Sequence, residues 1–201
     1  MTASPIPQSE RMAYFGYGSL VNLQTLRTPF IAAIPARVTG WRRCWLARPE
    51  GVGAGLARTD LAFLSVRPDA GTVIEGLVVV DHLSSLAALD AREALYARQE
   101  IPVALVEAAS EPWGVPSPDS AFLYVADAPP AQTGSILRSY LDAVMQGYLT
   151  QFGEAGLERF VATTDNFGLP VLEDRDAPIY PRAVVTTPQQ RALFDALVPP
   201  R

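Results

Sequence analysis

The chain has no lysine, one cysteine and one histidine among its 201 residues. All 16 of its cationic side chains are arginines, so it has neither a Schiff-base lysine nor the lysine of a P-loop. Cys44 and His82 alone are too few to build a cysteine–histidine zinc site, and a serine–histidine–aspartate triad would have to use His82. Carboxylates, hydroxyls and backbone amides remain as the groups available for catalysis.

Long apolar runs and targeting signals are also missing. No apolar stretch approaches the roughly 18 residues that span a bilayer, and the first seven residues lack the basic-then-apolar pattern of a secretory signal. Hydrophobic residues make up 49% of the chain, which is enough to bury a substantial core. The sequence therefore predicts one folded domain over residues 1–201, a cytoplasmic location and no membrane partner.

Basic charge is too scarce for a nucleic-acid partner. The formal net charge is −5, whereas binding to phosphates needs a basic face. One group of arginines, at Arg37, Arg42, Arg43 and Arg48, is clustered in the sequence. We expect this group to form a solvated surface of strands and turns, and Cys44 within it to be a packing residue.

Apolar, β-rich runs dominate the first two thirds of the chain, and helical periodicity dominates the end. Strands are expected at 13–17, 31–38, 42–47, 61–66, 73–80, 98–106 and 121–125, with an exposed proline-containing loop at 110–120. Helices are expected at 84–93, 135–152, 154–161 and 188–197, with a further short one starting near Asn22. Strands with interspersed helices favour a mixed α+β barrel or sheet.

The most informative segment runs from Tyr14 to Leu20, where an apolar strand leads directly into a glycine–serine turn. Such a turn directs several backbone N–H groups at one point, and glycine allows a ligand to approach closely. The segment lacks the later glycines and the lysine of nucleotide-binding loops. It could accept a carboxylate or a polarised carbonyl oxygen, or it could simply pack its aromatic residues.

These residues resemble the signature loop of the γ-glutamylcyclotransferase superfamily, which includes AIG2-like and ChaC-like proteins. Further positions agree with that family in order, namely Gly76, the run Leu89-Asp90-Ala91-Arg92-Glu93, Tyr96, Arg98, Tyr124, the run Ser139-Tyr140-Leu141, and Gly147. The resemblance covers roughly residues 13–153. It implies a small mixed β-barrel with peripheral helices over that core. We expect residues 154–201, which lie beyond the resemblance, to pack on the core as a C-terminal arm and helix.

The resemblance also implies a reaction and a site. A γ-glutamyl compound cyclises to 5-oxoproline when its own α-amino group attacks its γ-carbonyl, so neither metal nor cofactor is needed. Glu93 would be the catalytic general acid/base, with a pKa raised by partial desolvation. The substrate-binding residues would be Tyr17, Gly18, Ser19, Leu20 and Tyr96, and the partner would be a small γ-glutamyl molecule.

Several alternatives stay open at this stage. Glu75, beside Gly76, is a second candidate for the base. The loop and the Arg92-Glu93 pair look similar to the glutathione-specific, ChaC-like branch, whereas the later helix looks more like the general branch. The protein could also trim a γ-glutamyl cap from a biosynthetic intermediate, or bind a metabolite without catalysis. Finally, we expect Arg175 and Arg182 to strap the arm over the barrel, with Tyr180 and Arg182 near the mouth of the cavity.

Overall fold

The computed structural model describes residues 7, 10–27, 29–47, 60–108, 120–129, 131 and 133–198. Arg48, the N-terminal segment up to residue 6 and nearly all of the loop expected at 110–120 lie outside this described part.

The described fold is built around one curled, mixed sheet. Its hydrogen-bonded order is β4-β6-β1-β3-β2-β5, and a short strand, β8, adds to β2 in parallel. The strands are β1 (Arg11–Gly16), β2 (Ala32–Ala47), β3 (Ala62–His82), β4 (Ala97–Pro102), β5 (Val106–Ala108), β6 (Ser120–Val125) and β8 (Thr164–Asp165). Most neighbours are antiparallel, but β1 and β6 run in parallel. The expected α+β class is confirmed.

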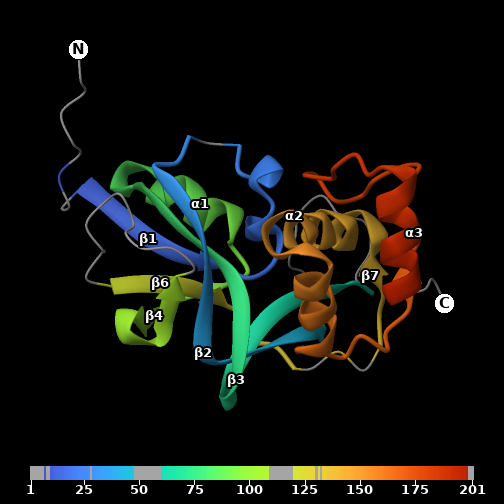
Figure 1. The fold of residues 1–201 in the computed structure, drawn as a ribbon, viewed down its shortest axis with the longest axis horizontal. Helices are drawn as coiled ribbons and strands as arrows, with labels where there is room; N and C mark the ends of the chain where they lie inside the picture. The colour runs from blue at the N-terminus through green and yellow to red at the C-terminus, as the bar shows by residue number, and fades with distance from the viewer. Residues whose placement is uncertain are drawn as a thin grey trace.

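Two long strands form the centre of the sheet and replace four that the sequence predicts. The breaks expected near residues 39–41 and 67–72 are irregularities inside β2 and β3, where the pairing register shifts between Thr39 and Trp41. Gly40 has a φ of 91°, a left-handed conformation that glycine adopts without strain. Gly40 therefore marks a bulge that bends the paired strands β2 and β3 (Figure 1) and does not end a strand. The prediction of four separate strands was wrong.

The core lies against the concave middle of this sheet. In β1, which lies between β3 and β6, every residue from Met12 to Gly16 is buried, so both faces of this strand are covered. A strand buried on both faces has a continuous apolar sequence rather than an alternating one. The strand expected at 98–106 is shorter than predicted, since β4 ends at Pro102 and the 3₁₀ turn Val103–Leu105 follows it.

Three α-helices complete the described part of the fold: α1 (Leu86–Arg92), α2 (Arg138–Ala162) and α3 (Pro188–Leu197). The two helices expected at 135–152 and 154–161 are the halves of α2, which is kinked at Gly153, where φ is 67°. Its expected first turn is instead a short strand, β7 (Ile136–Leu137), paired with β9 (Val171–Leu172). Helix α3 begins as predicted, with Pro188 in its first turn and Thr187 in a capping box.

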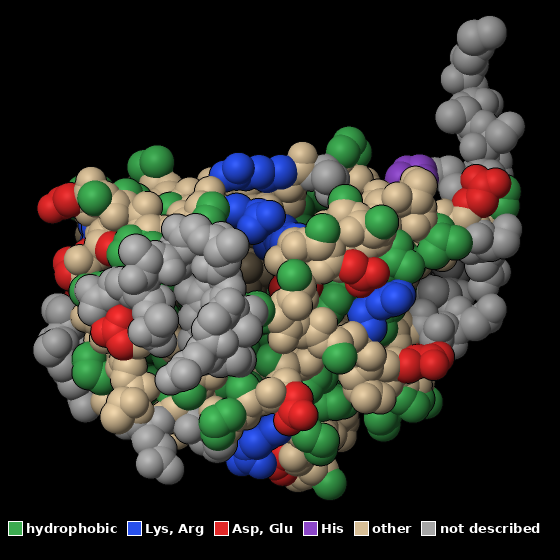
Figure 2. All heavy atoms as spheres, turned by 180° about the vertical axis from the view of Figure 1, so that it is seen from behind, with side chains coloured by type: hydrophobic (Ala, Val, Ile, Leu, Met, Phe, Trp, Pro, Cys, Tyr) green, Lys and Arg blue, Asp and Glu red, His purple; other side chains and the backbone are tan. Residues whose placement is uncertain are grey.

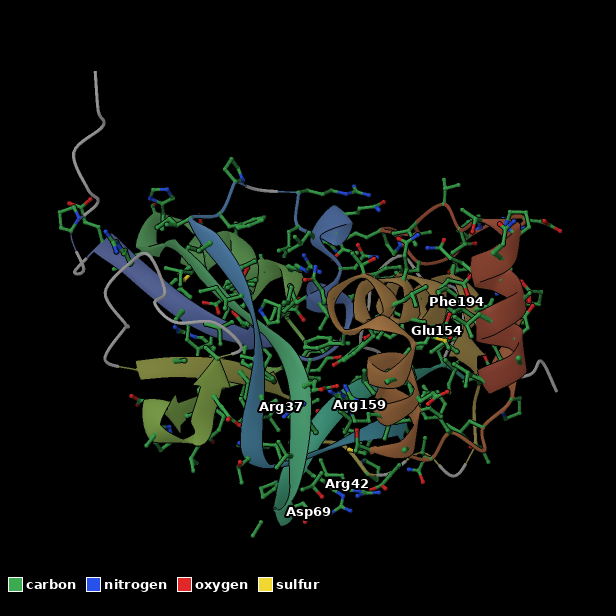
Figure 3. The ribbon with its side chains drawn as sticks, in the orientation of Figure 1. Arg37, Arg42, Asp69, Glu154, Arg159 and Phe194 are labelled. Carbon is green, nitrogen blue, oxygen red and sulfur yellow. The ribbon has the colours of Figure 1, made fainter. Side chains whose placement is uncertain are left out.

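Figure 1 shows α1 near one end of the sheet and α2 and α3 at the other, with α2 between the sheet and α3. Phe194 of α3 is fully buried and points toward α2 (Figure 3). None of the described helices combines the length and apolarity needed to cross a bilayer. On the face drawn in Figure 2, the described acidic and basic side chains are interspersed.

Candidate active site

The site begins at the loop that follows β1, here called the signature loop, residues Tyr17–Asn22. Its second part is a 3₁₀ turn, η2 (Ser19–Val21), closed by hydrogen bonds from Val21 N to Gly18 O (3.0 Å) and from Asn22 N to Ser19 O (3.1 Å). The Asn22 side-chain amide donates to Ala143 O (2.8 Å) in α2. The loop is thus held in shape by its own turn and tied to α2. The helix expected near Asn22 is only the 3₁₀ turn η3 (Leu23–Thr25).

Two glycines let the loop sit between β3 and α2. A Cβ atom on Gly147 of α2 would lie 2.7 Å from the backbone nitrogen of Asn22, and one on Gly76 of β3 would collide with the carbonyl oxygen of Gly16. Neither neighbour can move aside easily, because both are backbone atoms. These two glycines therefore allow close packing that fixes the loop.

Arg43 lies beneath the loop and orients one of its peptide groups. The side chain is 1% exposed, and it donates to Tyr17 O (3.2 Å), to Glu75 O and to the Tyr148 hydroxyl (2.6 Å). The Tyr148 hydroxyl in turn lies 2.8 Å from Tyr17 O. The prediction that Arg43 belongs to a solvated arginine surface was wrong: a guanidinium can be buried when each of its donors finds an acceptor.

The orientation of the Tyr17 carbonyl, which faces Arg43, fixes the direction of the Gly18 N–H. In a trans peptide the C=O and the following N–H point in opposite directions, so the Gly18 N–H is directed away from Arg43. Gly18 and Leu20 are both buried, and within the described part of the chain neither N–H has a hydrogen-bond acceptor. Buried backbone donors are rarely left unpaired, which makes these two amides candidates for holding a ligand oxygen.

Glu93 stands at the C-terminal end of α1. Its N–H donates to Leu89 O (2.9 Å) and its carbonyl accepts from Tyr96 N (2.8 Å), so the backbone on both sides is fixed. Its carboxylate forms an ion pair with Arg92 (Nε to Oε1, 2.9 Å), and the Glu93 side chain is 16% exposed. Arg92 also donates to Thr25 O (3.0 Å) and contacts the Ser19 hydroxyl at 3.4 Å. Arg92 therefore links the predicted base to the signature loop.

Burial raises the pKa of Glu93 above its ordinary value, while the positive charges of Arg92 and Arg182 act in the opposite direction. The net shift is upward, because loss of hydration costs the carboxylate more than the two guanidinium groups return. A carboxylate with a raised pKa is better able to exchange a proton near neutral pH. This electrostatic setting is the one that a general acid/base requires.

The tyrosines expected near the site make mostly internal hydrogen bonds. Tyr17 is buried and its hydroxyl donates to Tyr124 O (2.5 Å), while the Tyr124 hydroxyl donates to Asp90 (2.8 Å). The half-buried Tyr96 donates to Leu64 O (2.8 Å). Tyr140, which the sequence offers only as part of a motif, lies closer to the loop: its hydroxyl is 3.0 Å from the position of a Cβ atom on Gly18.

The C-terminal arm reaches the same region. The Tyr180 ring packs edge-on against Tyr140, with centroids 5.0 Å apart, and Arg182 acts electrostatically on Glu93. Arg175 fixes the arm through ion pairs with Asp142 of α2 (2.7 Å) and Asp195 of α3 (2.9 Å).

Glu75, the second candidate base, belongs to a different cluster. Its carboxylate pairs with Arg159 of α2 (2.8 Å) and with Arg37 of β2 (3.2 Å), which approach each other in Figure 3. It lines one cavity with both arginines and Glu107 and a second with Arg37 and Glu107, and neither cavity is lined by Glu93 or the signature loop. The backbone carbonyl of Glu75 shares donors with Tyr17 O, but it is the carboxylate of Glu93, and not that of Glu75, that is linked to the loop.

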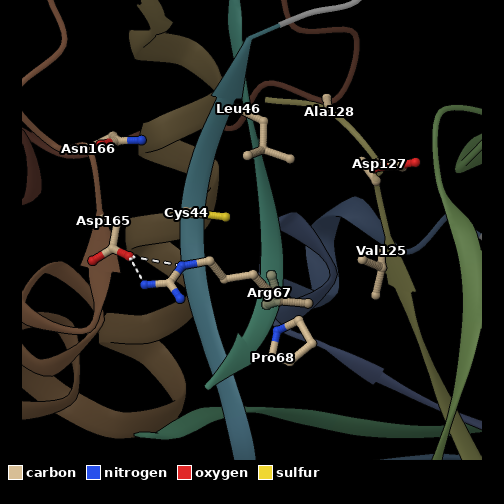
Figure 4. Close-up of a pocket in the computed structure, with 11 residues that line it drawn as sticks. Cys44, Leu46, Arg67, Pro68, Val125, Asp127, Ala128, Asp165 and Asn166 are labelled. Atoms are coloured by element: carbon tan, nitrogen blue, oxygen red, sulfur yellow. Dashed lines mark hydrogen bonds and ion pairs between the residues drawn. The ribbon is translucent and has the colours of Figure 1, made fainter. Parts of the chain in front are cut away.

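A larger cavity of about 780 Å³ lies elsewhere, beside Cys44 and the ion pair between Arg67 and Asp165 (Figure 4). Burial raises the pKa of the Cys44 thiol to about 11, so it stays protonated and unreactive. Its buried position fits the packing role expected for it. Across the described residues, no three His, Cys, Asp or Glu side chains are grouped so as to hold a metal ion.

Comparisons with known proteins place this geometry in a class. A solved structure described as a γ-glutamyl cyclotransferase is similar with a TM-score of 0.58 and 15% identity, covering 93% of this chain and 99% of that one. The uncharacterized protein loc79017 from Homo sapiens is similar with a TM-score of 0.56 and 15% identity, covering 92% and 99% of the two chains. The structure of YkqA from Bacillus subtilis is similar with a TM-score of 0.54 and 19% identity, covering 74% of this chain and 52% of that one. At such identities these likenesses establish the fold.

The family follows from the sequence. Residues 14–142 match the model of the family described as "Gamma-glutamyl cyclotransferase, AIG2-like", and the chain belongs to this family. A search of the curated proteins finds no match. Family and fold together define an enzyme of the γ-glutamyl cyclotransferase type, as the signature-loop resemblance predicts. The match ends at residue 142, so Tyr180 and Arg182 of the arm lie beyond it.

Proposed function

We propose that the protein converts a γ-glutamyl amide or peptide to 5-oxoproline and a free amine, with Glu93 as the general acid/base. The observation that carries this proposal is the placement of Glu93, a buried carboxylate of raised pKa that Arg92 links to the signature loop. Among the described residues, the N–H groups of Gly18 and Leu20 in this loop have no hydrogen-bond acceptor. The nucleophile is part of the substrate, which agrees with a chain that offers neither lysine nor a second histidine.

The signature loop holds the γ-glutamyl group in this proposal. The N–H groups of Gly18 and Leu20 donate to an oxygen of that group, and the γ-carbonyl oxygen is the one on which negative charge develops. Fixed amides in a buried site stabilise such charge without reorganising, so they favour the tetrahedral intermediate over the bound substrate. Folding the substrate so that its amine approaches its own carbonyl supplies the reactive geometry.

Glu93 moves the protons. Its carboxylate takes a proton from the α-ammonium group, and the freed amine attacks the γ-carbonyl carbon to form the ring C–N bond. The bond from that carbon to the outgoing nitrogen then breaks as Glu93 returns this proton to the leaving nitrogen. Glu93 also takes the second proton from the ring nitrogen and passes it to the released amine, which becomes an ammonium. Protons removed from the α-nitrogen thus end on the released amine, and the reaction balances without an external oxidant, reductant or cofactor.

The test is direct. The purified protein is incubated separately with glutathione, γ-glutamyl-alanine and a γ-glutamyl amine, and 5-oxoproline is measured by chromatography. We expect 5-oxoproline and the free amine in equal amounts from at least one compound. Turnover of glutathione alone would assign the glutathione-specific alternative. Binding of these compounds with no release of 5-oxoproline would overturn the proposal and leave a metabolite-binding member of the family.

A further inference from the structure

A small apolar cavity lies at the junction of the sheet, α2 and the C-terminal arm. Its volume is about 160 Å³, and its lining side chains are all aliphatic or aromatic: Leu61, Ala62, Phe63, Leu95, Tyr96, Leu137, Tyr140 and Tyr180. Two edge-on ring pairs shape its walls, Phe63 with Tyr96 (5.7 Å between centroids) and Tyr140 with Tyr180 (5.0 Å). A cavity of about this size with such a lining binds a benzene ring in an engineered protein.

The cavity adjoins the proposed reaction centre. Leu95 and Tyr96 stand two and three residues after Glu93, in the turn closed by the hydrogen bond from Tyr96 N to Glu93 O (2.8 Å). Tyr140 also lines the cavity, and its hydroxyl is 3.0 Å from the position of a Cβ atom on Gly18 of the signature loop. A group bonded to the γ-carbonyl, and pointing away from the γ-glutamyl part, would therefore enter this cavity.

Tyr180 is held in place by buried polar contacts. Asp174, 7% exposed, accepts hydrogen bonds from the Ser139 backbone (2.7 Å) and from Ile179 N (2.9 Å), and the Ser139 hydroxyl lies 3.2 Å from Tyr180 N. The Pro181 carbonyl accepts from Arg27 at 2.8 Å. Because the backbone is fixed on both sides of Tyr180, its ring is a rigid wall of the cavity.

The lining also excludes a charged occupant. None of the eight lining residues carries a charge, and burial raises the pKa of the Tyr96 and Tyr140 hydroxyls, so both stay neutral. An ammonium or carboxylate group would lose its hydration here without gaining an ionic partner, which is strongly unfavourable. An apolar ring or branched chain loses nothing comparable and gains contact with the four aromatic rings of the lining.

We propose that this cavity selects γ-glutamyl substrates whose leaving amine carries an uncharged apolar group of about benzyl or isobutyl size, with Tyr180 as a specificity-determining residue. The inference rests on the proposed function, since it takes the leaving group of that reaction as the occupant. It assigns a role to the arm, which lies outside the matched family region.

Three matched substrates test the proposal: γ-glutamyl-benzylamide, γ-glutamyl-methylamide and γ-glutamyl-(2-aminoethyl)amide. They share the γ-glutamyl part and differ in size and charge of the leaving group. We expect kcat/KM for the benzylamide to exceed that for each of the others by about tenfold or more, since a single apolar contact group is worth about 10–200-fold. Equal or better turnover of the methylamide or aminoethylamide would overturn the proposal.

Variants locate the effect in the cavity. Tyr180→Ala should lower kcat/KM for the benzylamide about tenfold, mainly through KM, and change the methylamide value by less than about twofold. Ala62→Leu, which adds a side chain inside the cavity, should act in the same direction. The control is Val185→Ala, at a residue of the same arm that is 89% exposed, and it should change neither value. Equal losses for both substrates in Tyr180→Ala would refute a specificity role.

Failure of the reaction and failure of the cavity can be separated. If no substrate yields 5-oxoproline, binding of the benzylamide and the methylamide is measured by calorimetry. A preference for the benzylamide that Tyr180→Ala removes would support the cavity assignment while the proposed reaction fails. Absence of that preference would overturn the cavity assignment as well.

Discussion

Glu93→Gln separates the acid/base role of this residue from its structural role. In the parent protein Arg92 Nε lies 2.9 Å from the Glu93 carboxylate. The amide of the variant keeps the size of the side chain and an oxygen that can accept from Arg92, but it cannot take up a proton. Loss of a general base costs about 10²–10⁴ in rate, equivalent to roughly 3–5 kcal/mol of activation free energy. We therefore expect kcat for 5-oxoproline release to fall by that factor, with KM nearly unchanged because in the proposed mechanism the loop amides, and not Glu93, hold the substrate.

Glu93→Gln should also change how the free energy of unfolding depends on pH. Because the folded-state pKa of Glu93 is raised, its contribution to stability is fully present at low pH and is lost as pH rises through the folded pKa. The Gln side chain does not titrate, so the free energy of unfolding of Glu93→Gln relative to the parent should improve over that pH window. Urea denaturation at a series of pH values measures this difference.

A matched control is Glu100→Gln, at an exposed position of β4, which should leave both activity and stability unchanged. Release of 5-oxoproline by Glu93→Gln at the parent rate would refute the assignment of the base. A loss of activity accompanied by a large loss of stability would instead show that Glu93 acts by holding the fold.

The remaining predictions concern the groups around the base. Arg92→Met removes a positive charge that lowers the pKa of Glu93, so the acidic limb of the kcat/KM profile should move to higher pH, whereas Arg92→Lys should restore much of its position. Arg43→Met removes the guanidinium that donates to the buried carbonyls of Tyr17 and Glu75, which then share the single hydroxyl proton of Tyr148. It should lower the free energy of unfolding by about 2–5 kcal/mol in urea titrations; an unchanged value would refute its structural role. Gly147→Ala forces a Cβ against the loop backbone and should cost about 1–3 kcal/mol by the same assay and lower activity, unlike Gly168→Ala, which places its Cβ in open space.

The elements of the fold could be predicted from local patterns, but their continuity could not. Alternation and apolar runs locate the strands well because burial demands them, and Pro188 with Thr187 marks the start of α3. Glycine signals are ambiguous, since the same residue can end a strand, form a bulge or kink a helix. Gly40 and Gly153 are used in the last two ways, and the choice depends on tertiary packing that no local window contains.

The candidate site was accessible to sequence reasoning in part. The loop motif and the run ending in Glu93 are local patterns, so the residues within each of them could be named from the sequence. Arg43 could not, because a charged residue on a strand is usually solvated, and its burial depends on acceptors supplied by Tyr17, Glu75 and Tyr148. Nothing local signals that Arg182 lies near Glu93, some ninety residues earlier in the chain.

Two largely enclosed arginines, Arg43 and Arg92, have tasks that suit a guanidinium better than an ammonium group. Arg43 donates to two backbone carbonyls and two hydroxyls, and Arg92 connects Glu93, Ser19 and Thr25. Each task needs several donors held in a plane at fixed angles, which a guanidinium provides and a single ammonium does not. A carboxylate that must stay partly desolvated near neutral pH also benefits from partners that never lose their charge. Arginine thus fixes the loop and moderates the pKa of the base without itself becoming a proton acceptor.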